Sequence, residues 1–171
     1  VHLVTANTDL PNVEGITTTL VETAEQMSAV LELEFPHSDA LIMSAAVADA
    51  KVANYSEAKI RKESLNRVDL AKNPDILKSL STNKKLNQIM IGFAAETSED
   101  LAMLEENGRA KLASKSLDLI YVNNVTNGAV FGSNFTQGLI IDRDMNVIKV
   151  PEISKDTLSD ILLDQLVSKL G

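Results

Sequence analysis

Nearly continuous apolar runs alternate along the chain with segments of helical spacing. Runs of this kind are typical of strands that are buried on both faces of a sheet. They predict strands at residues 1–5, 39–46, 88–95 and 117–122. Helical spacing predicts helices at 24–33, 73–80, 98–114 and 154–170. Such alternation is typical of α/β proteins, so we expect a three-layer α/β/α, Rossmann-like fold with a mainly parallel sheet.

Local signals place the ends of these elements. Thr23 resembles a helix N-cap, and Thr97 or Ser98 is expected to cap the helix that ends near Ser114. The sequence Asn73-Pro74 predicts a helix start, with Asn as the cap and Pro at the first helical position. Residues 139–150 alternate like an antiparallel hairpin appended to the sheet. Because two isolated strands are marginal, we expect this hairpin to form the interface of a homodimer.

Length and charge narrow the class of protein. With 171 residues, we expect one domain, residues 1–171. The net charge of -8 argues against general nucleic-acid binding, which relies on excess Lys and Arg. Residues 1–50 contain no Lys or Arg, whereas residues 51–85 hold nine of the sixteen basic side chains against four acidic ones. This basic segment suits a compact anionic ligand, although a solvated basic loop remains the alternative.

Several classes of site find no support in the sequence. There is no Cys for a disulfide, a thiolate metal site or a thiol nucleophile, and the two His have no partners at metal-ligand spacing. No apolar run approaches the roughly 18 residues of a membrane span, so we expect a soluble, cytoplasmic protein. The chain lacks GxGxxG, GxxxxGK and GxSxG patterns. Either it binds phosphate in another way, or an N-terminal piece precedes Val1.

The candidate site begins at the strand that ends in Met43-Ser44-Ala45. Asp49 follows this strand, and ten residues later comes the cluster Lys59-Ile60-Arg61-Lys62. Ligands bind where α/β strands end, so a carboxylate and several cations there suit a polyphosphate with Mg²⁺. Asp49 could hold Mg²⁺ or cap the next segment. Residues 51–66 show little periodicity and are expected to form a mobile flap.

Further candidates follow in the second half. Lys111 and Lys115 are four residues apart on a predicted helix, so they repel unless an anion lies between them. The helix dipole alone also favours cations in this last turn. Phe93 belongs to an apolar strand and is expected in the core on composition. Glu96, directly after that strand, is a candidate for orienting polar groups in the cleft.

Five motifs, in this order, resemble bacterial phosphopantothenate-cysteine ligase over nearly the whole chain. They are Ser44-Ala45-Ala46-Val47-Ala48-Asp49, Lys59-Ile60-Arg61-Lys62, Lys72-Asn73-Pro74-Asp75-Ile76-Leu77, Ile91-Gly92-Phe93-Ala94-Ala95-Glu96-Thr97 and Lys115-Ser116-Leu117-Asp118-Leu119-Ile120. The resemblance implies ligation of 4'-phosphopantothenate to L-cysteine in coenzyme A biosynthesis. CTP would convert the carboxylate to an acyl-cytidylate, which the amine of cysteine then attacks.

The resemblance also implies roles for individual residues. Lys59 would be the catalytic cation that contacts the triphosphate, and Asp49 would lie near the metal. The implied nucleotide-binding residues are Met43, Ser44, Ala45, Asp49, Lys59, Pro74, Asp75, Ile76, Leu77, Phe93, Lys111 and Lys115.

Family members carry further binding residues upstream of the position of Val1, so we expect this chain alone to be catalytically incomplete. Many bacteria fuse the domain behind a flavin-dependent decarboxylase, and FMN is expected only in that case. Three alternatives stay open: the same ligation with ATP, an NAD(P)-binding oxidoreductase, and a non-catalytic nucleotide-binding module. Asn123-Asn124 departs from the Ala-Asn-Asp usual in the family.

Overall fold

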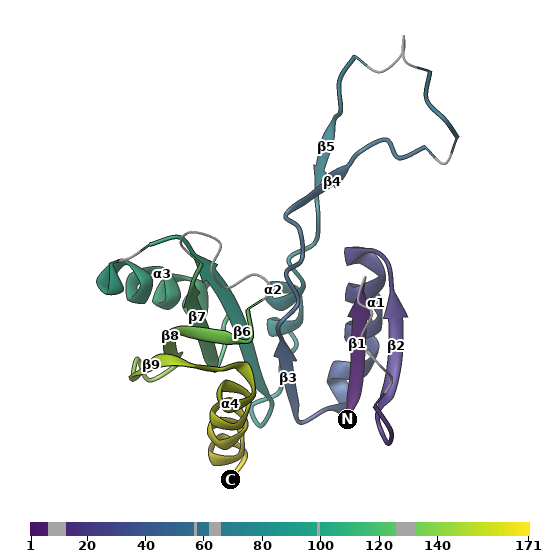
Figure 1. The fold of residues 1–171 in the computed structure, drawn as a ribbon. Coiled ribbons are helices and arrows are strands. Elements are labelled where there is room, and N and C mark those ends of the chain that lie inside the picture. The colour runs from purple at the N-terminus through teal and green to yellow at the C-terminus, as the bar shows by residue number, and fades with distance from the viewer. Residues whose placement is uncertain (7–12, 57, 62–65, 99, 126–132) are drawn as a thin grey trace. The chain divides into compact units, whose positions relative to one another are not determined.

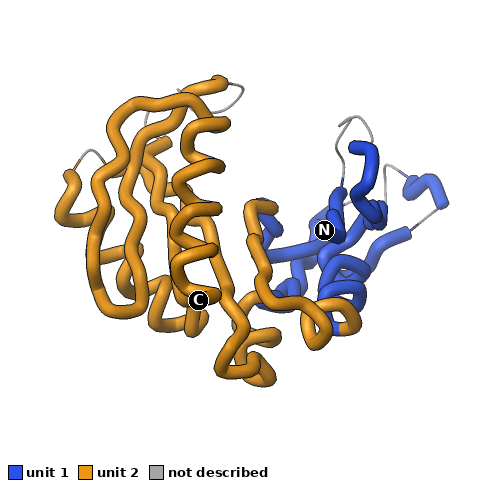
Figure 2. Tube along the Cα trace, turned by 90° about the horizontal axis from the view of Figure 1, so that it is seen from below, with its two compact units in different colours: residues 1–32, 46–76 blue, residues 33–45, 77–171 orange. Residues whose placement is uncertain are grey.

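The computed structural model describes residues 1–6, 13–56, 58–61, 66–98, 100–125 and 133–171. Its contacts divide the chain into two compact units, which Figure 2 shows in different colours. Unit 1 comprises residues 1–32 and 46–76, and unit 2 comprises residues 33–45 and 77–171. The expectation of a single domain over residues 1–171 stays a prediction.

Unit 1 contains a parallel strand pair and most of a helix. β1 (His2–Ala6) pairs with β2 (Thr17–Val21), so that His2 faces Thr17 and Ala6 faces Val21. Helix α1 (Ala24–Glu34) follows, and its last two residues belong to unit 2. Thr23 Oγ1 accepts from Gln26 N at 3.1 Å, while Gln26 Oε1 accepts from Thr23 N at 3.2 Å. This reciprocal pair is a capping box, so the cap predicted at Thr23 is confirmed.

Unit 1 also contains a short antiparallel ribbon. β4 (Ala50–Val52) pairs with β5 (Leu70–Lys72), and Ala50 faces Lys72. The alternation of Val68, Asp69 and Leu70 is typical of a strand, and β5 lies two residues further along the chain. Figure 1 shows the ribbon leading into the segment between β4 and β5. Of the expected flap, residues 57 and 62–65 lie outside the described residues.

Unit 2 is built on a five-stranded mixed sheet (Figure 1). Its strands are β3 (Ala40–Met43), β6 (Ile89–Glu96), β7 (Leu119–Asn124), β8 (Phe135–Asp142) and β9 (Val147–Ser154), in the order β3-β6-β7-β8-β9. β3, β6 and β7 are parallel, whereas β8 and β9 are antiparallel to their neighbours. The predicted α/β class, with parallel strands followed by a hairpin, is confirmed.

The hairpin is an integral part of this sheet. β8 pairs with β7 from Asp142, opposite Leu119, to Gly138, opposite Asn123. Leu139, Ile140 and Ile141 are all buried. Because the hairpin already packs within its own unit, the reason for expecting a subunit interface there no longer holds.

Helices lie against both faces of the sheet. The cluster that contains Ile91 and Tyr121 also contains Leu158 and Leu162 of α4 (Lys155–Leu170). α3 (Leu101–Ser114) packs on β7 and β8. At Gly108 on α3, a Cβ atom would come within 2.6 Å of Val122 and 2.7 Å of Ile141, so only Gly permits this close approach. Since alternate residues of a strand face opposite ways, α3 and α4 lie on opposite faces.

Some helix starts differ from the prediction. Asp100, not Thr97 or Ser98, caps α3, and its side chain accepts from Ala102 N at 2.8 Å. α2 (Ile76–Ser81) begins two residues after the expected Pro74. The single-turn helix η1 (Phe35–His37) follows α1 directly. Ser154 caps α4 by accepting from Thr157 N, so α4 begins one residue after the predicted start at residue 154.

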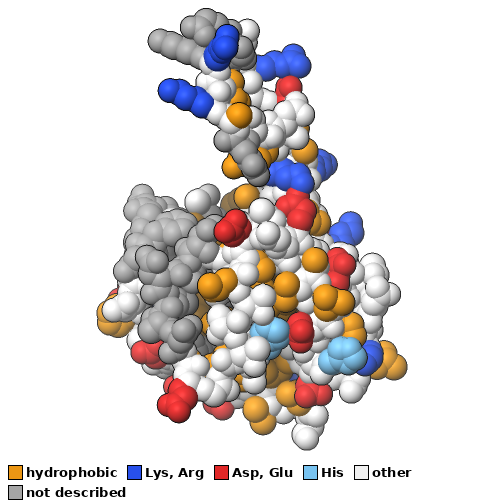
Figure 3. Space-filling view, turned by 90° about the vertical axis from the view of Figure 1, so that its right-hand side faces the viewer, with side chains coloured by type: hydrophobic (Ala, Val, Ile, Leu, Met, Phe, Trp, Pro, Cys, Tyr) orange, Lys and Arg blue, Asp and Glu red, His pale blue; other side chains and the backbone are white. Residues whose placement is uncertain are grey.

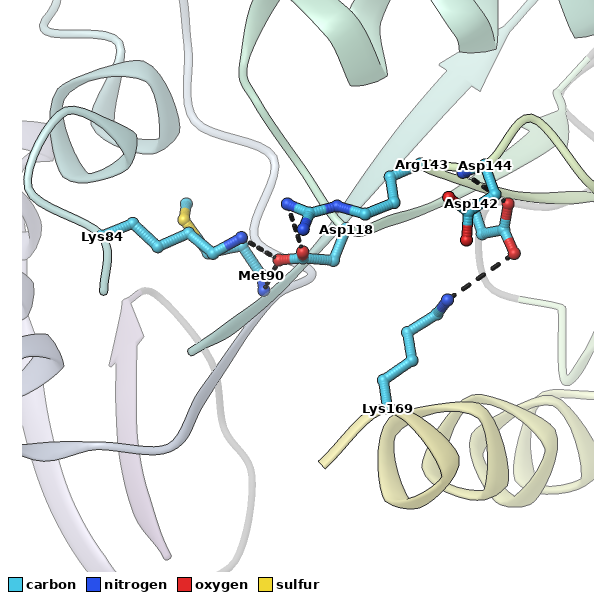
Figure 4. Close-up of polar contacts among 7 residues, drawn as sticks. All are labelled: Lys84, Met90, Asp118, Asp142, Arg143, Asp144 and Lys169. Carbon is cyan, nitrogen blue, oxygen red and sulfur yellow. Dashed lines mark hydrogen bonds and ion pairs between the residues drawn. The ribbon is translucent and has the colours of Figure 1, made fainter. Parts of the chain in front are cut away.

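A buried carboxylate fixes the amino-terminal edge of the sheet in unit 2 (Figure 4). Asp118, just before β7, accepts from Met90 N of β6 at 2.7 Å and also from the Lys84 ammonium. Its other oxygen binds Arg143 Nη2 at 2.6 Å, in the turn between β8 and β9. The side chains of Asp118 and Lys84 are 2% and 8% exposed. One side chain thus joins β6, β7, the β8–β9 turn and the loop after α2.

Candidate functional site

The carboxyl edge of the parallel strands in unit 2 carries several candidate residues. Met43, the last residue of β3, lies opposite Gly92, and β6 continues for four more residues to Glu96. Met43 is buried, whereas Ser44 and Ala45 are exposed where the chain leaves the sheet. Ser44 and Ala45 are therefore open to solvent at this edge, and their contact with a nucleotide stays a prediction.

A polar cluster occupies the end of β6. Glu96 accepts from Lys111 Nζ at 2.5 Å and from Asn107 Nδ2 at 3.0 Å, and both partners belong to α3. The side chain of Glu96 is 16% exposed and that of Lys111 is 45% exposed. One donor of the Lys111 ammonium is thus engaged, and much of the side chain still faces solvent. The sequence indicated Glu96 but not Asn107. The only signal for Asn107 is its position four residues, or one helical turn, before Lys111.

Lys115 lies at the C-terminal end of the same helix. It is the C-cap residue of α3, and its backbone N–H donates to Lys111 O at 3.1 Å. The predicted positions of Lys111 and Lys115 in the last turn are confirmed. Both ammonium groups suit the negative end of the helix dipole, so this location has a structural reason of its own, and a role in ligand binding stays a prediction.

Phe93 packs on the face of the sheet that α4 covers. Its ring meets the Tyr121 ring edge-on, with centroids 5.9 Å apart and an interplanar angle of 73°. Phe93 is half-buried against the cluster around Ile91 and Leu158. Burial raises the pKa of Tyr121, although its hydrogen bond with Thr136 acts in the opposite direction. Phe93 and the cluster of Glu96 and Lys111 thus approach the same edge from opposite faces.

The side chains of Ile76 and Leu77 lie in the core. They are 3% and 8% exposed. In unit 2, Leu77 packs near Gly92, where an added Cβ atom would lie 3.5 Å from Leu77 and 2.6 Å from Leu117. A nucleotide contact at these two positions would therefore use the backbone. Pro74 and Asp75 are exposed.

In unit 1, the remaining candidates gather around the base of the ribbon. Asp49 is exposed, and its backbone carbonyl accepts from Asn73 N at 2.9 Å. Asn73 Nδ2 donates to Ala48 O at 2.8 Å. Asn73 Oδ1 has no hydrogen-bond partner among the described residues. The prediction that Asn73 caps α2 is wrong, because its amide binds Ala48.

Basic side chains follow the ribbon and the segment beyond it. Figure 3 shows Lys and Arg side chains gathered there. Lys51 at the start of the ribbon pairs with Glu25 of α1, and Arg67 pairs with Asp69 at 3.3 Å. Lys59 and Arg61 are exposed, and Lys62 lies outside the described residues. Lys59 belongs to unit 1 whereas Lys111 and Lys115 belong to unit 2. Their convergence on one ligand stays a prediction.

The donor set can be tested against the expected Mg²⁺. No group of three or more His, Cys, Asp or Glu side chains suited to a metal occurs within the described residues. Mg²⁺ in nucleotide sites commonly binds one or two carboxylates together with phosphate oxygens and water. Exposed Asp49 fits a shared site of this kind, in which the nucleotide supplies further ligands. Among the described helices, none is long and apolar enough to cross a membrane.

Comparison with known proteins extends these observations. Residues 1–170 match the family described as DNA/pantothenate metabolism flavoprotein C-terminal domain. The chain is 33% identical over 165 residues to the Coenzyme A biosynthesis bifunctional protein CoaBC of Borreliella burgdorferi, covering 95% of this chain and 40% of that protein. With the protein of the same name from Bacillus subtilis it shares 37% identity over 147 residues, covering 85% and 35%.

A solved structure supports the same relationship. The crystal structure of the C-terminal domain of CoaBC superposes with a TM-score of 0.77 at 28% identity, covering 96% of this chain and 71% of that one. Fold and edge geometry define an α/β domain with a mixed sheet and a polar carboxyl edge. The chain belongs to the DNA/pantothenate metabolism flavoprotein C-terminal domain family. It spans about 40% of the length of the B. burgdorferi relative.

Proposed function

We propose that this chain is the ligase domain that joins 4'-phosphopantothenate to L-cysteine in coenzyme A biosynthesis. The observation that carries the proposal is the family match over residues 1–170. Of the five sequence motifs, residues 44–49 follow β3 and residues 91–97 include the carboxyl end of β6. Residues 115–120 lie instead between the end of α3 and the start of β7, where Asp118 meets the amino-terminal edge of the sheet. Relatives named as coenzyme A biosynthesis proteins are consistent with this activity.

The proposed reaction has two steps. A carboxylate oxygen of phosphopantothenate attacks the α-phosphorus of CTP, and the bond to pyrophosphate breaks. The neutral amine of cysteine then attacks the acyl-cytidylate carbonyl, CMP leaves with the bonding electron pair, and the nitrogen loses a proton. Negative charge grows on the phosphoryl oxygens in the first step, so cations placed there lower the barrier.

The proposal assigns these electrostatic roles to residues of this chain. Lys59 contacts the triphosphate and stabilises the charge as the α-phosphate is attacked. Lys111 and Lys115 hold further phosphate oxygens, and Asp49 binds the Mg²⁺ that accompanies the nucleotide. The exposed residues Ser44, Ala45, Pro74 and Asp75 bind the nucleoside, and Phe93 packs beside the base or ribose.

Pyrophosphate release tests the activity and its nucleotide. The full-length protein is incubated with phosphopantothenate, Mg²⁺ and either CTP or ATP. We expect release with CTP well above that with ATP. Faster release with ATP would replace CTP by ATP in the proposal, and no release with either nucleotide would end it.

A matched pair of substitutions tests the role of Lys59. Lys59→Gln is expected to lower kcat by roughly 10²-fold, in the range found when one charge-stabilising group is removed. Lys149→Gln, at an exposed position on β9, removes the same charge and is expected to keep the parent rate. Equal rates for the two variants would remove the catalytic role of Lys59.

The larger assembly is part of the proposal. We propose that this chain is part of a longer cytoplasmic protein. A flavin-dependent decarboxylase domain makes up much of the rest of that protein and binds FMN. We also propose a homodimer formed through the ribbon, where Val52 and Leu70 are 46% and 68% exposed. A Leu70→Lys variant should then have half the parent mass by light scattering. A monomeric parent would contradict the dimer.

A further inference from the structure

The connection between β4 and β5 ends in an unusual way. Asn73 N donates to Asp49 O at 2.9 Å, which extends the ladder one step beyond the pair of Ala50 and Lys72. The next residue, Pro74, falls at a non-hydrogen-bonded position opposite Ala48, where an antiparallel ladder supplies no backbone donor. The Asn73 side chain supplies a donor instead, since Nδ2 donates to Ala48 O at 2.8 Å. One residue thus binds two successive carbonyls of the Ala48–Asp49 segment.

The other half of the Asn73 amide argues against a purely local role. An Asn that precedes a helix normally accepts a hydrogen bond from the first turn through Oδ1. Here Oδ1 is buried and unpartnered among the described residues. A buried acceptor without a partner is unfavourable, so the side chain is not arranged to maximise the stability of α2. The orientation of the amide follows from the Ala48 carbonyl, which requires a donor.

The two segments joined by Asn73 are those assigned to the nucleotide. One of these segments contains Asp49, and the other begins with Pro74 and Asp75. All of these residues belong to unit 1. We propose that Asn73 is a positioning residue of the nucleotide site, because it holds the Ala48–Asp49 segment against the start of the Pro74–Asp75 segment. The proposal rests on the proposed function, and it adds a residue that makes no contact with the reacting atoms.

The physical reason is preorganisation. Asp49 and Ala48 are exposed, so few packing contacts hold this segment in place. Hydrogen bonds at an exposed position contribute little to overall stability. They nevertheless fix the separation of two groups that must meet one ligand, and a loosened site binds more weakly because binding must then order it. Losing the Nδ2 donor should therefore affect nucleotide affinity more than folding.

Calorimetric titration of Mg²⁺-CTP, and separately of Mg²⁺-ATP, into the full-length protein tests the proposal. The parent is measured first, since an absence of binding of both nucleotides overturns the proposed function itself. We then expect Asn73→Ala to weaken binding roughly tenfold, the equivalent of one hydrogen bond of about 1.4 kcal/mol. Asn87→Ala, at an exposed position just before β6, serves as the matched control and should bind like the parent.

Asn73→Asp provides the second variant. It keeps the size of the side chain and the acceptor oxygens, but at neutral pH it has no donor for Ala48 O. We expect the same weakening as for Asn73→Ala, with a raised nucleotide KM and a kcat that is kept at saturating nucleotide. Parent-like affinity in either variant overturns the positioning role while leaving the proposed function intact. Loss of the folded state in both variants, seen by circular dichroism, also overturns it.

Discussion

The Asp118 cluster of unit 2 allows a sharp prediction about stability. Asp118→Asn removes the negative charge that two cations share, and Lys84, at 8% exposure, is left as a buried ammonium. Removing one partner of a buried pair costs about 3–5 kcal/mol. The half-exposed Arg143 adds about 1 kcal/mol at most. Because the amide oxygen can still accept from Met90 N, we expect a loss of about 3 kcal/mol.

Urea unfolding followed by circular dichroism measures this loss. A loss of about 3 kcal/mol is a large part of the 5–15 kcal/mol that stabilises typical domains, so the midpoint should move clearly to lower urea. The control is Asp164→Asn, at an exposed position on α4, which should change stability by less than about 0.5 kcal/mol. A loss below about 1 kcal/mol for Asp118→Asn would refute the reasoning.

A second substitution separates the unpaired charge from other effects. Lys84→Met removes the ammonium, and in combination with Asp118→Asn no buried charge is left without a partner at this position. We therefore expect the double variant to be more stable than Asp118→Asn alone, which gives a coupling energy between the two sites. Additive losses would show that the ion pair is not the cause. Because Asp118 lies at the amino-terminal edge of the sheet, nucleotide affinity of the folded variant should stay unchanged.

Three further predictions concern unit 2. Gly138→Ala should destabilise by about 2 kcal/mol or more in the same assay, because its Cβ would strike the Val122 backbone, which cannot move aside like a side chain. Burial raises the pKa of Asp142, but hydrogen bonds from Asn146 and Asp144 together with the Lys169 charge hold it below 3.8 overall. Its contribution to stability is thus present above the unfolded pKa and is lost as pH falls through the folded pKa, so Asp142→Asn should flatten the stability profile below about pH 4. Glu96→Gln should raise CTP affinity in calorimetry and Lys111→Gln should lower it, with stability changes below about 1 kcal/mol.

The sheet could largely be predicted from the sequence, because its strands are nearly continuous apolar runs. Ile89, Met90 and Ile91 are all buried, and such a continuous apolar run is typical of a strand that is covered on both faces. The integration of β8 could not be predicted in the same way. A hairpin pattern indicates that β8 and β9 pair with each other through a short turn. It does not indicate that the other edge of β8 pairs with β7, because this pairing joins distant segments, with Gly138 opposite Asn123.

The start of α2 was predicted wrongly because a tertiary partner competed for the capping side chain. Thr23 caps α1 as expected, because its side chain bonds within the first turn and Gln26 completes the capping box. Asn73 has an equally strong local preference, yet its amide binds Ala48, 25 residues away. Capping preferences are derived from helix termini alone. They cannot take account of a competing hydrogen bond to a distant carbonyl, such as Ala48 O, which comes close only in the folded ribbon.

The structure changes the argument for a ligand near Lys111. From the sequence, repulsion between Lys111 and Lys115 suggested that an anion lies beside them. Glu96 supplies such an anion from the protein itself, at 2.5 Å from Lys111 Nζ. A triphosphate at this edge would therefore have to share the ammonium with Glu96 or displace it, and each costs part of the binding energy. Opposite effects of Glu96→Gln and Lys111→Gln on CTP affinity are the signature of that competition, and two unchanged affinities would leave the pair with a purely structural role.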